Sequence, residues 1–209
     1  MPRRNEKGFE ARRQQIIEGA LRAFAAKGYE EATNRDIAEA AGIGSPGLIY
    51  HYFKDKGDLF RAVLEQRVPL LQLLAHPEEL LALPLEEALT RAGRAYLSMM
   101  DDHETTTFLR LLFGEAVRSQ QVADRFAEVG PQRGLEFLAV YLERQMDAGT
   151  LRRSDPRIAA RCFLGPLILL LLTREIVRQP GLSDFDVEAY RAAALDIFLH
   201  GMKPLLSEL

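Results

Sequence analysis

The sequence has little of several features that define large classes of proteins. Its 209 residues contain one cysteine, Cys162, which excludes an intramolecular disulfide framework and a zinc site built from several cysteines. The basic residues 1–7 are not followed by an apolar segment, so we expect no secretory signal. The longest apolar run, residues 162–172, is shorter than the roughly 20 residues of a membrane span. We therefore expect a cytoplasmic protein with no membrane partner, in which this run forms a helix buried on both sides.

Signals for β-structure are also scarce, since the chain shows no sustained alternation and no Asn-Gly or Asp-Gly hairpin. Helical periodicity runs through the whole sequence and predicts an all-α fold. A change of texture near residues 67–70 predicts two domains, residues 1–67 and residues 68–209. The expected helices span about residues 10–27, 33–41, 46–52, 55–68, 85–100, 104–118, 120–148 with an interruption at 130–131, 155–179 and 184–206.

Charge is distributed unevenly along the chain. The formal net charge is −3, but residues 1–67 hold twelve cations and ten anions, whereas the remainder holds 15 cations and 20 anions. The positive balance at the N-terminal end indicates a polyanionic partner there.

Residues 33–53 contain the signals of a helix-turn-helix that follows a first helix. Gly28 is placed to end the first helix in the left-handed conformation, and residues 33–36 (Thr-Asn-Arg-Asp) form a potential capping box. Gly42 supplies a tight turn, and Ser45-Pro46 offers an N-cap residue followed by proline at the first helical position. Two short helices joined in this way predict that the second one enters the major groove of DNA.

The side chains around this motif separate into two expected roles. Cationic and hydroxyl groups suit phosphates, and such contacts position a duplex without reading it; the candidates are Arg35, Tyr50, His51, Lys54 and Lys56. The second short helix contains no Arg, Asn or Gln, so bidentate base contacts are missing and specificity is expected to depend on shape and apolar contacts. The candidates on its exposed face are Ser45, Pro46, Leu48 and Tyr50. Tyr52 and Phe53 are expected to pack inward.

In this order and spacing, residues 10–67 resemble the DNA-binding domain of the TetR/AcrR family of bacterial transcriptional regulators. The matching elements are Ile16–Ala20 with Phe24 and Gly28-Tyr29, Thr33–Ala38, Ala41–Ile43, and Gly47–Lys56 followed by Leu59. Two departures are present: Gly44 is one residue more than the usual turn contains, and Gly57 stands where the family often has glutamate.

The resemblance implies a ligand-responsive homodimer, usually a repressor, that binds a palindromic operator in double-stranded DNA. The C-terminal helical domain would bind a hydrophobic or amphipathic small molecule, and the last two long helices would form a four-helix dimer interface. The resemblance also implies no cofactor and no catalytic residue. It puts Thr33, Tyr50, His51 and Lys56 at phosphate-contacting positions, and Ser45, Pro46, Gly47 and Leu48 near base-facing ones.

Large apolar residues of the C-terminal half either line an effector pocket or pack a core, and the sequence favours core packing for any single one. The candidates for the pocket are Tyr96, Met99, Phe108, Leu111, Tyr141, Phe163, Leu167 and Leu170. Two polar residues, Glu115 and Arg174, either anchor a polar head group or pair with nearby charges. Because a helix that is apolar all round needs cover on every side, a dimer interface is expected over residues 162–172 with Phe198, Leu199, Met202 and Leu205.

The sequence leaves three other hypotheses, namely an enzyme, a metal site and an interaction module that does not bind specific DNA. An all-α enzyme has little support, because the sequence has no nucleophile elbow and no metal-ligand spacing. A metal site at residues 101–104 (Asp-Asp-His-Glu) is disfavoured because adjacent residues rarely converge on one ion; a polar junction that caps the next helix is the better interpretation. A helical interaction module without a DNA role would bind duplexes weakly and without sequence preference.

Overall fold

The computed structural model describes the backbone of residues 4–182 and 184–204, and the side chains of all of these except residues 4–6 and 131. The regular elements of this part of the chain are all helical, which confirms the predicted all-α class. The chain divides into two compact units, one of residues 1–67 with 102–129 and the other of residues 68–101 with 130–209. Residues 102–129, which we expected in the C-terminal domain, are thus grouped with the N-terminal residues.

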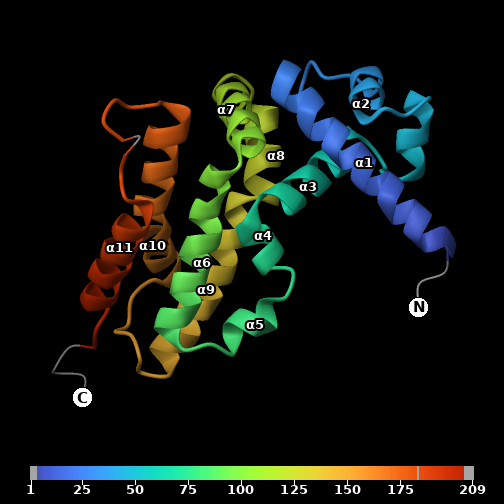
Figure 1. The fold of residues 1–209 in the computed structure, drawn as a ribbon. Helices are drawn as coiled ribbons and strands as arrows, with labels where there is room; N and C mark the ends of the chain where they lie inside the picture. Colours follow the sequence, from blue (N-terminus) through green and yellow to red (C-terminus); the bar gives the residue numbers. More distant parts are fainter. Residues whose placement is uncertain (1–3, 183, 205–209) are drawn as a thin grey trace. The chain divides into compact units, whose positions relative to one another are not determined.

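The first unit contains six helices among the residues described (Figure 1). They are α1 (Arg4–Lys27), α2 (Asn34–Ala41), the 3₁₀ helix η1 (Pro46–His51), α3 (Lys56–Arg67), α7 (His103–Arg118) and α8 (Gln120–Val129). Aromatic packing explains why α7 joins this unit. The Phe108 ring of α7 lies 6.4 Å from Phe24 of α1 and 6.1 Å from Phe60 of α3, between ring centroids, and all three side chains are buried.

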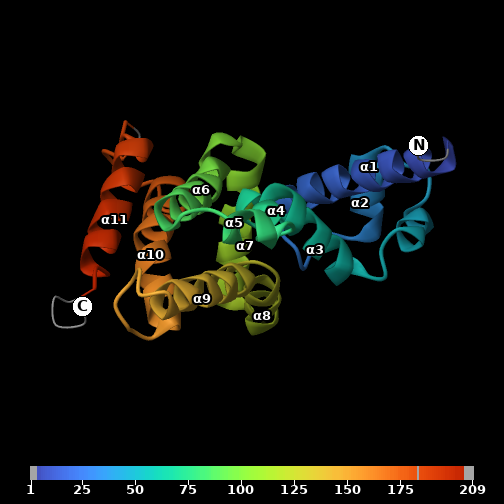
Figure 2. The same cartoon turned by 90° about the horizontal axis from the view of Figure 1, so that it is seen from below.

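The second unit holds the remaining helices (Figure 2). Several of them begin at a proline. They are α4 (Pro69–Leu73), α5 (Pro77–Leu81), α6 (Leu85–Leu97), the 3₁₀ helix η2 (Ser98–Asp101), α9 (Pro131–Asp147), α10 (Pro156–Leu171), the π-helical turn η3 (Leu172–Ile176) and α11 (Val187–Gly201). Proline is favoured at the first helical position because the missing N–H would have no partner there. Leu205, expected at the dimer interface, lies outside the described residues.

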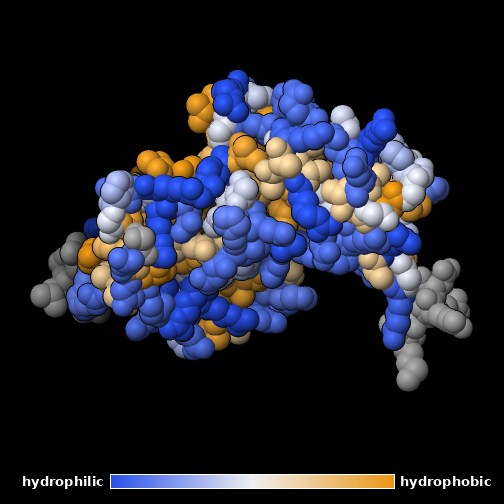
Figure 3. Space-filling view, turned by 45° about the horizontal axis from the view of Figure 1, so that its top comes forward, coloured by the Kyte–Doolittle hydropathy of each residue, from blue (hydrophilic) through white to orange (hydrophobic). Residues whose placement is uncertain are grey.

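Helix α10 contains most of the long apolar run. Phe163, Leu167 and Leu170 are buried, whereas Ile158 and Leu169 are each 58% exposed. Within this chain, therefore, the helix is buried on one side and open on the other. The segment Pro156–Ile176 is apolar and long enough to cross a membrane by length and composition, but core helices of water-soluble proteins meet the same test. On the face drawn in Figure 3, hydrophobic residues form islands among hydrophilic ones.

Candidate functional site

The ends of α2 have the geometry that the sequence predicts. The Asp36 amide donates to Thr33 Oγ1 at 3.2 Å, and the Thr33 amide donates to Asp36 Oδ2 at 2.9 Å, which confirms the capping box. At the other end Gly42 adopts a left-handed φ of 64° and its amide donates to Glu39 O. Gly28 likewise ends α1 with φ of 84°. Both predicted helix stops are therefore confirmed.

Polar side chains of α1 form hydrogen bonds to the end of α2, and the sequence interpretation had not identified them. Gln15 Nε2 donates to Ala41 O, and Arg22 Nη2 donates to Ala40 O, each at 2.6 Å. These bonds satisfy carbonyls that have no partner within the helix. Gly19 allows the close approach, because a Cβ built on it would lie 2.5 Å from Ala41 Cβ. Gln15 and Arg22 are seven residues apart and therefore lie on one face of the helix. This spacing was the one sequence signal that could have indicated a shared polar contact.

The second helix of the motif is a six-residue 3₁₀ helix, η1. Ser45 is its N-cap with an extended backbone and Pro46 follows it, but among the described residues the Ser45 side chain makes no capping hydrogen bond. The side-chain part of the predicted cap was therefore wrong. Ile49 is buried and anchors η1. The Phe53 side chain is also buried, as predicted, whereas Tyr52 is half-buried and its ring lies 4.6 Å from Phe9.

Most residues expected to contact DNA are accessible. The exposed ones are Thr33, Arg35, Ser45, Pro46, Gly47, Tyr50, His51 and Lys54, and Leu48 is half-buried. Asn34 Nδ2 donates to the Tyr50 hydroxyl oxygen at 2.8 Å and so joins the start of α2 to η1. Because the hydroxyl accepts in that bond, its hydrogen is free to donate. The sequence interpretation had not singled out Asn34.

Lys56 lies differently from the other candidates. Its Nζ donates to Glu30 O at 2.8 Å and Ala32 O at 3.0 Å, and it lies 4.8 Å from the centroid of the Tyr29 ring. Desolvation by burial lowers the pKa of Lys56 from its ordinary value. The ammonium group thus holds the turn between α1 and α2, and one of its three N–H groups remains for another acceptor.

Residues 28–32 form this turn, and Glu115 of α7 contacts it as well. The Tyr29 amide donates to Glu115 Oε2 at 2.6 Å, and the Glu30 amide donates to Oε1 at 3.3 Å. The sequence interpretation had expected a ligand contact or a nearby ion pair for Glu115. Instead, the carboxylate binds backbone amides 86 and 85 residues away in sequence, a pairing that helical periodicity cannot show.

The ten effector candidates are divided between the two units. Tyr96, Met99, Tyr141, Phe163, Leu167, Leu170 and Arg174 lie in the second unit, and Phe108, Leu111 and Glu115 in the first. Burial raises the pKa of the Tyr96 hydroxyl. Tyr141 donates to Leu83 O at 3.2 Å and packs beside Leu80 and Phe137, with no space for a water molecule between them. Tyr141 and these neighbours therefore pack as a core and do not line an open pocket of the roughly 300–1,000 Å³ that small-molecule sites have.

Arg174 and Asp102 engage nearby groups. Arg174 Nε lies 3.3 Å from Glu175 Oε1. Asp102 is the N-cap of α7: its Oδ1 accepts from the Glu104 amide at 3.1 Å and its Oδ2 from Thr105 Oγ1 at 2.6 Å. This confirms the interpretation of residues 101–104 as a junction that caps a helix. Within residues 4–182 and 184–204, no group of three or more His, Cys, Asp or Glu residues could hold a metal ion.

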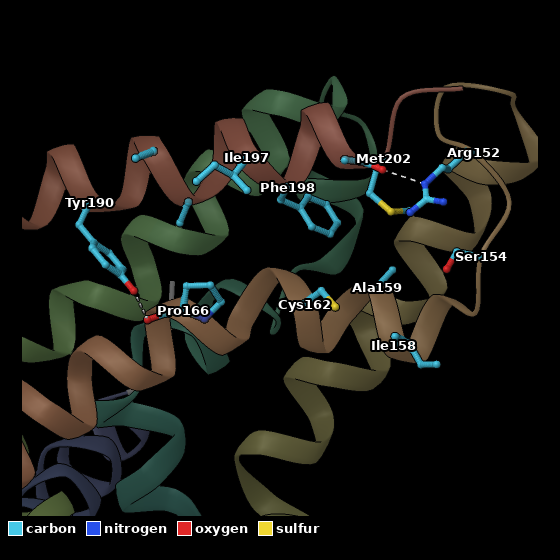
Figure 4. Close-up of a pocket in the computed structure, with 13 residues that line it drawn as sticks. Arg152, Ser154, Ile158, Ala159, Cys162, Pro166, Tyr190, Ile197, Phe198 and Met202 are labelled. Carbon is cyan, nitrogen blue, oxygen red and sulfur yellow. Dashed lines mark hydrogen bonds between the residues drawn. The ribbon is translucent and has the colours of Figure 1, made fainter. Parts of the chain in front are cut away.

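A groove of about 560 Å³ lies between α10 and α11 (Figure 4). Cys162, Ile197 and Phe198 are among its mostly apolar lining residues, and Ile197 is 71% exposed. Hydrogen bonds close both ends: the Arg152 amide donates to Met202 O at 2.9 Å, and the Tyr190 hydroxyl donates to Pro166 O at 3.0 Å. Phe198 and Met202 of this groove were expected at a dimer interface.

Two protein-family models match this chain, one over the helix-turn-helix and one over the C-terminal helices. The family model described as bacterial regulatory proteins of the tetR family matches residues 16–63, and that of the C-terminal domain of AefR-like transcriptional repressors matches residues 87–201. The chain is 32% identical over 177 residues to the HTH-type transcriptional repressor Rv1474c of Mycobacterium tuberculosis, covering 83% of this chain and 87% of that protein.

Two further relatives support the same assignment. The HTH-type transcriptional repressor AcnR of Corynebacterium glutamicum is 34% identical over 155 residues, covering 73% of this chain and 75% of that protein. The crystal structure of a TetR-family transcriptional regulator from Mesorhizobium loti superposes with a TM-score of 0.70 at 25% identity, covering 93% of this chain and 98% of that one. This chain therefore belongs to the TetR family of bacterial transcriptional regulators, whose members are not enzymes.

Proposed function

We propose that this protein is a homodimeric cytoplasmic repressor that binds a palindromic operator and is released from it by a small apolar or amphipathic effector. The observation that carries the proposal is a group of exposed polar side chains on a helix-turn-helix whose backbone is anchored by buried apolar side chains. Thr33, Tyr50 and Lys54 are exposed, whereas Ile49 and Phe53 anchor the same segment in the core.

The exposed residues are suited to different parts of a duplex. The Tyr50 hydroxyl, oriented by Asn34, and the cations Arg35 and Lys54 are suited to phosphate oxygens. Ser45 and Leu48, at the start of η1, are suited to base edges and thymine methyl groups. Binding would then depend on phosphate neutralisation for affinity and on η1 for sequence preference.

Self-association through α10 and α11 would cover the open side of α10. The groove between these helices has mostly apolar walls, and Ile158 and Ile197 at its border are 58% and 71% exposed. A second copy presents the same surface, and isologous contact of this kind is the commonest route to a dimer. A two-fold dimer reads two half-sites about 34–36 Å apart, one turn of DNA, which is why we propose a palindromic operator.

The effector is proposed to bind in the second unit, among the buried side chains of α6, α9 and α10. Tyr141, Phe163 and Leu167 supply a buried, largely apolar surface there. A ligand that opens this core would favour a second arrangement of the dimer. In that arrangement the spacing of the two η1 helices would no longer match adjacent major grooves.

Selection from random duplexes tests DNA recognition. The purified full chain should enrich a palindromic site, and its affinity should fall steeply with salt concentration because phosphate contacts release counterions. Lys54→Ala should weaken binding to all duplexes similarly, whereas Ser45→Ala or Leu48→Ala should change the preferred site. Val117→Ala, at a position 87% exposed on α7, is the matched control. Failure to enrich any site would overturn the proposal.

Sedimentation tests the dimer. Ile197→Asp introduces a charge on the open side of the α10–α11 groove, so a wild-type dimer should become a monomer with its helical content unchanged. Val140→Asp, at another exposed apolar residue of the second unit (49% exposed), is the control and should remain a dimer. A wild-type monomer at operator-binding concentrations would contradict the dimeric part of the proposal.

A further inference from the structure

The turn at residues 28–32 is held by side chains from two different helices. From α7, Glu115 accepts hydrogen bonds from the Tyr29 and Glu30 amides at 2.6 and 3.3 Å. Ser119, the C-cap of α7, adds a third contact, since its hydroxyl donates to Glu30 Oε1 at 3.0 Å. The last turn of α7 is thus bonded to the residues that lead into α2.

Lys56, at the first position of α3, holds the carbonyl groups of the same turn. Its Nζ donates to Glu30 O and Ala32 O, next to the capping residue Thr33. The turn therefore has its amides bound by a carboxylate and its carbonyls bound by an ammonium group. Hydrogen bonds to charged groups are stronger than those between neutral groups, so the two side chains together fix the entry of the chain into α2.

Gly28 provides the space that this arrangement requires. Its φ is 84°, a conformation that L-residues rarely adopt, and a Cβ built on it would overlap Glu115 Oε1 and the carboxyl carbon. The carboxylate thus occupies the place of the missing side chain. Position 28 has two separate reasons to be glycine, and one of them is the Glu115 contact itself.

We propose that Glu115 is a positioning residue that couples α7 to the helix-turn-helix and keeps α2 and η1 in the arrangement that binds DNA. This inference rests on the proposed DNA-binding function. Phe108 of the same helix packs against Phe24 and Phe60, so α7 contacts both the core of the first unit and the turn. A displacement of α7 that withdraws the carboxylate would release the Tyr29 and Glu30 amides and weaken operator binding.

The test compares Glu115→Ala and Glu115→Gln with the wild-type chain. Glu115→Ala should lower affinity for the selected operator about tenfold, and Glu115→Gln should lower it less, since its amide oxygen still accepts one hydrogen bond. The slope of affinity against salt concentration should stay unchanged, because no phosphate contact is lost. Amide hydrogen exchange at Tyr29 and Glu30 should accelerate in Glu115→Ala without DNA.

A general loss of stability must be separated from loss of positioning. Phe126→Leu is the matched control: the Phe126 ring packs on Phe113 of α7 with 5.2 Å between centroids and has no part in the turn. Lower operator affinity in Glu115→Ala than in Phe126→Leu, at equal unfolding temperature, supports the proposal. Equal affinities, or unchanged exchange at Tyr29 and Glu30, would overturn the proposed role of Glu115 and leave the proposed function standing. A wild-type chain that selects no duplex would overturn the proposed function.

Discussion

Both units cap helices with side chains, but they differ in what their longest-range charged contacts bind. In the first, side chains bind backbone groups at helix ends: Gln15 binds the end of α2, Thr33 caps its start, and Glu115 binds the turn before it. In the second, the most buried charge belongs to a side-chain cluster, in which Arg191 donates twice to Glu188 and Arg94 donates to the same carboxylate. At these sites the first unit uses charge to fix a turn of the backbone, whereas the second uses it to join the side chains of α6 and α11.

The largest expected effect tests the dependence on backbone geometry. Gly28→Ala should lower the free energy of unfolding by about 3 kcal/mol, since it combines an unfavourable φ with overlap against Glu115. Gly149→Ala, in the second unit, should cost only about 1 kcal/mol, because its φ of 73° is equally unfavourable but, apart from its chain neighbours, no described residue has a heavy atom within 4 Å of the new Cβ. Chemical denaturation measures both.

Equal losses in these two variants would show that the conformation alone matters. The contact between position 28 and Glu115 would then contribute nothing measurable, and the contrast between the units would lose its strongest support. A Gly28→Ala variant combined with Glu115→Ala should recover part of the loss, because the overlap is removed while the unfavourable φ remains.

Acid titration tests the ionic cluster of the second unit. Hydrogen bonds from Arg191 and Arg94 lower the pKa of Glu188 from 4.5 to about 2. Its stabilising contribution should therefore be complete above about pH 5 and be lost as the pH falls from about 4.5 to about 2. Glu188→Gln should cost about 2 kcal/mol at pH 7, a value reduced for the exposure of the carboxylate, and much less at pH 2.5. Thermal unfolding at several pH values measures the difference.

A pH-independent loss in Glu188→Gln would contradict this account. Arg191, whose side chain is 8% exposed, would then be stabilised by packing rather than by charge. The control is Glu78→Gln, because Glu78 is 72% exposed beside His76 and should change stability little at either pH.

Helix caps offer a smaller and closely matched pair. Thr33→Ala removes the cap of α2, and Asp155→Ala removes that of α10, where the carboxylate accepts from the Arg157 amide at 2.8 Å and the Ile158 amide at 3.3 Å. Each should cost about 1 kcal/mol in unfolding free energy. Only Thr33→Ala should also weaken operator binding beyond that loss, because α2 belongs to the DNA-binding motif. Weakened operator binding in both variants would indicate an effect of stability alone.

The same contrast explains what the sequence could and could not predict. Capping boxes and left-handed glycines depend on neighbouring residues, so the ends of α2 at Thr33 and Gly42 and the end of α1 at Gly28 were predictable. The order of short-range signals between residues 33 and 53 also made the helix-turn-helix recognisable. Tyr50 and Lys54 are among the site residues that were expected to face solvent, and they are exposed. Their exposure follows from their positions within the motif, which are local in sequence.

Long-range pairings were not predictable in this way. Glu115 lies on an apolar helix face that suggested a ligand site, and its true partners are backbone amides far earlier in the chain. Lys56 was expected to contact phosphate together with Lys54, and the sequence did not show that its ammonium group also binds the turn at Glu30. Phe108 was assigned to the effector half because periodicity does not reveal which core an amphipathic helix joins. Each of these outcomes depends on tertiary packing.

The smallest expected effect concerns Gly44, which the resemblance marks as one residue more than the usual turn contains. Its φ lies outside the left-handed region, and, apart from its chain neighbours, no described residue has a heavy atom within 4 Å of a Cβ built on it. Gly44→Ala should therefore change the free energy of unfolding by no more than about 0.5 kcal/mol, unlike Gly42→Ala at φ of 64°. If operator preference nevertheless changes, the added residue affects recognition through the path of the turn before η1; a destabilisation as large as that of Gly42→Ala would show that this path is constrained.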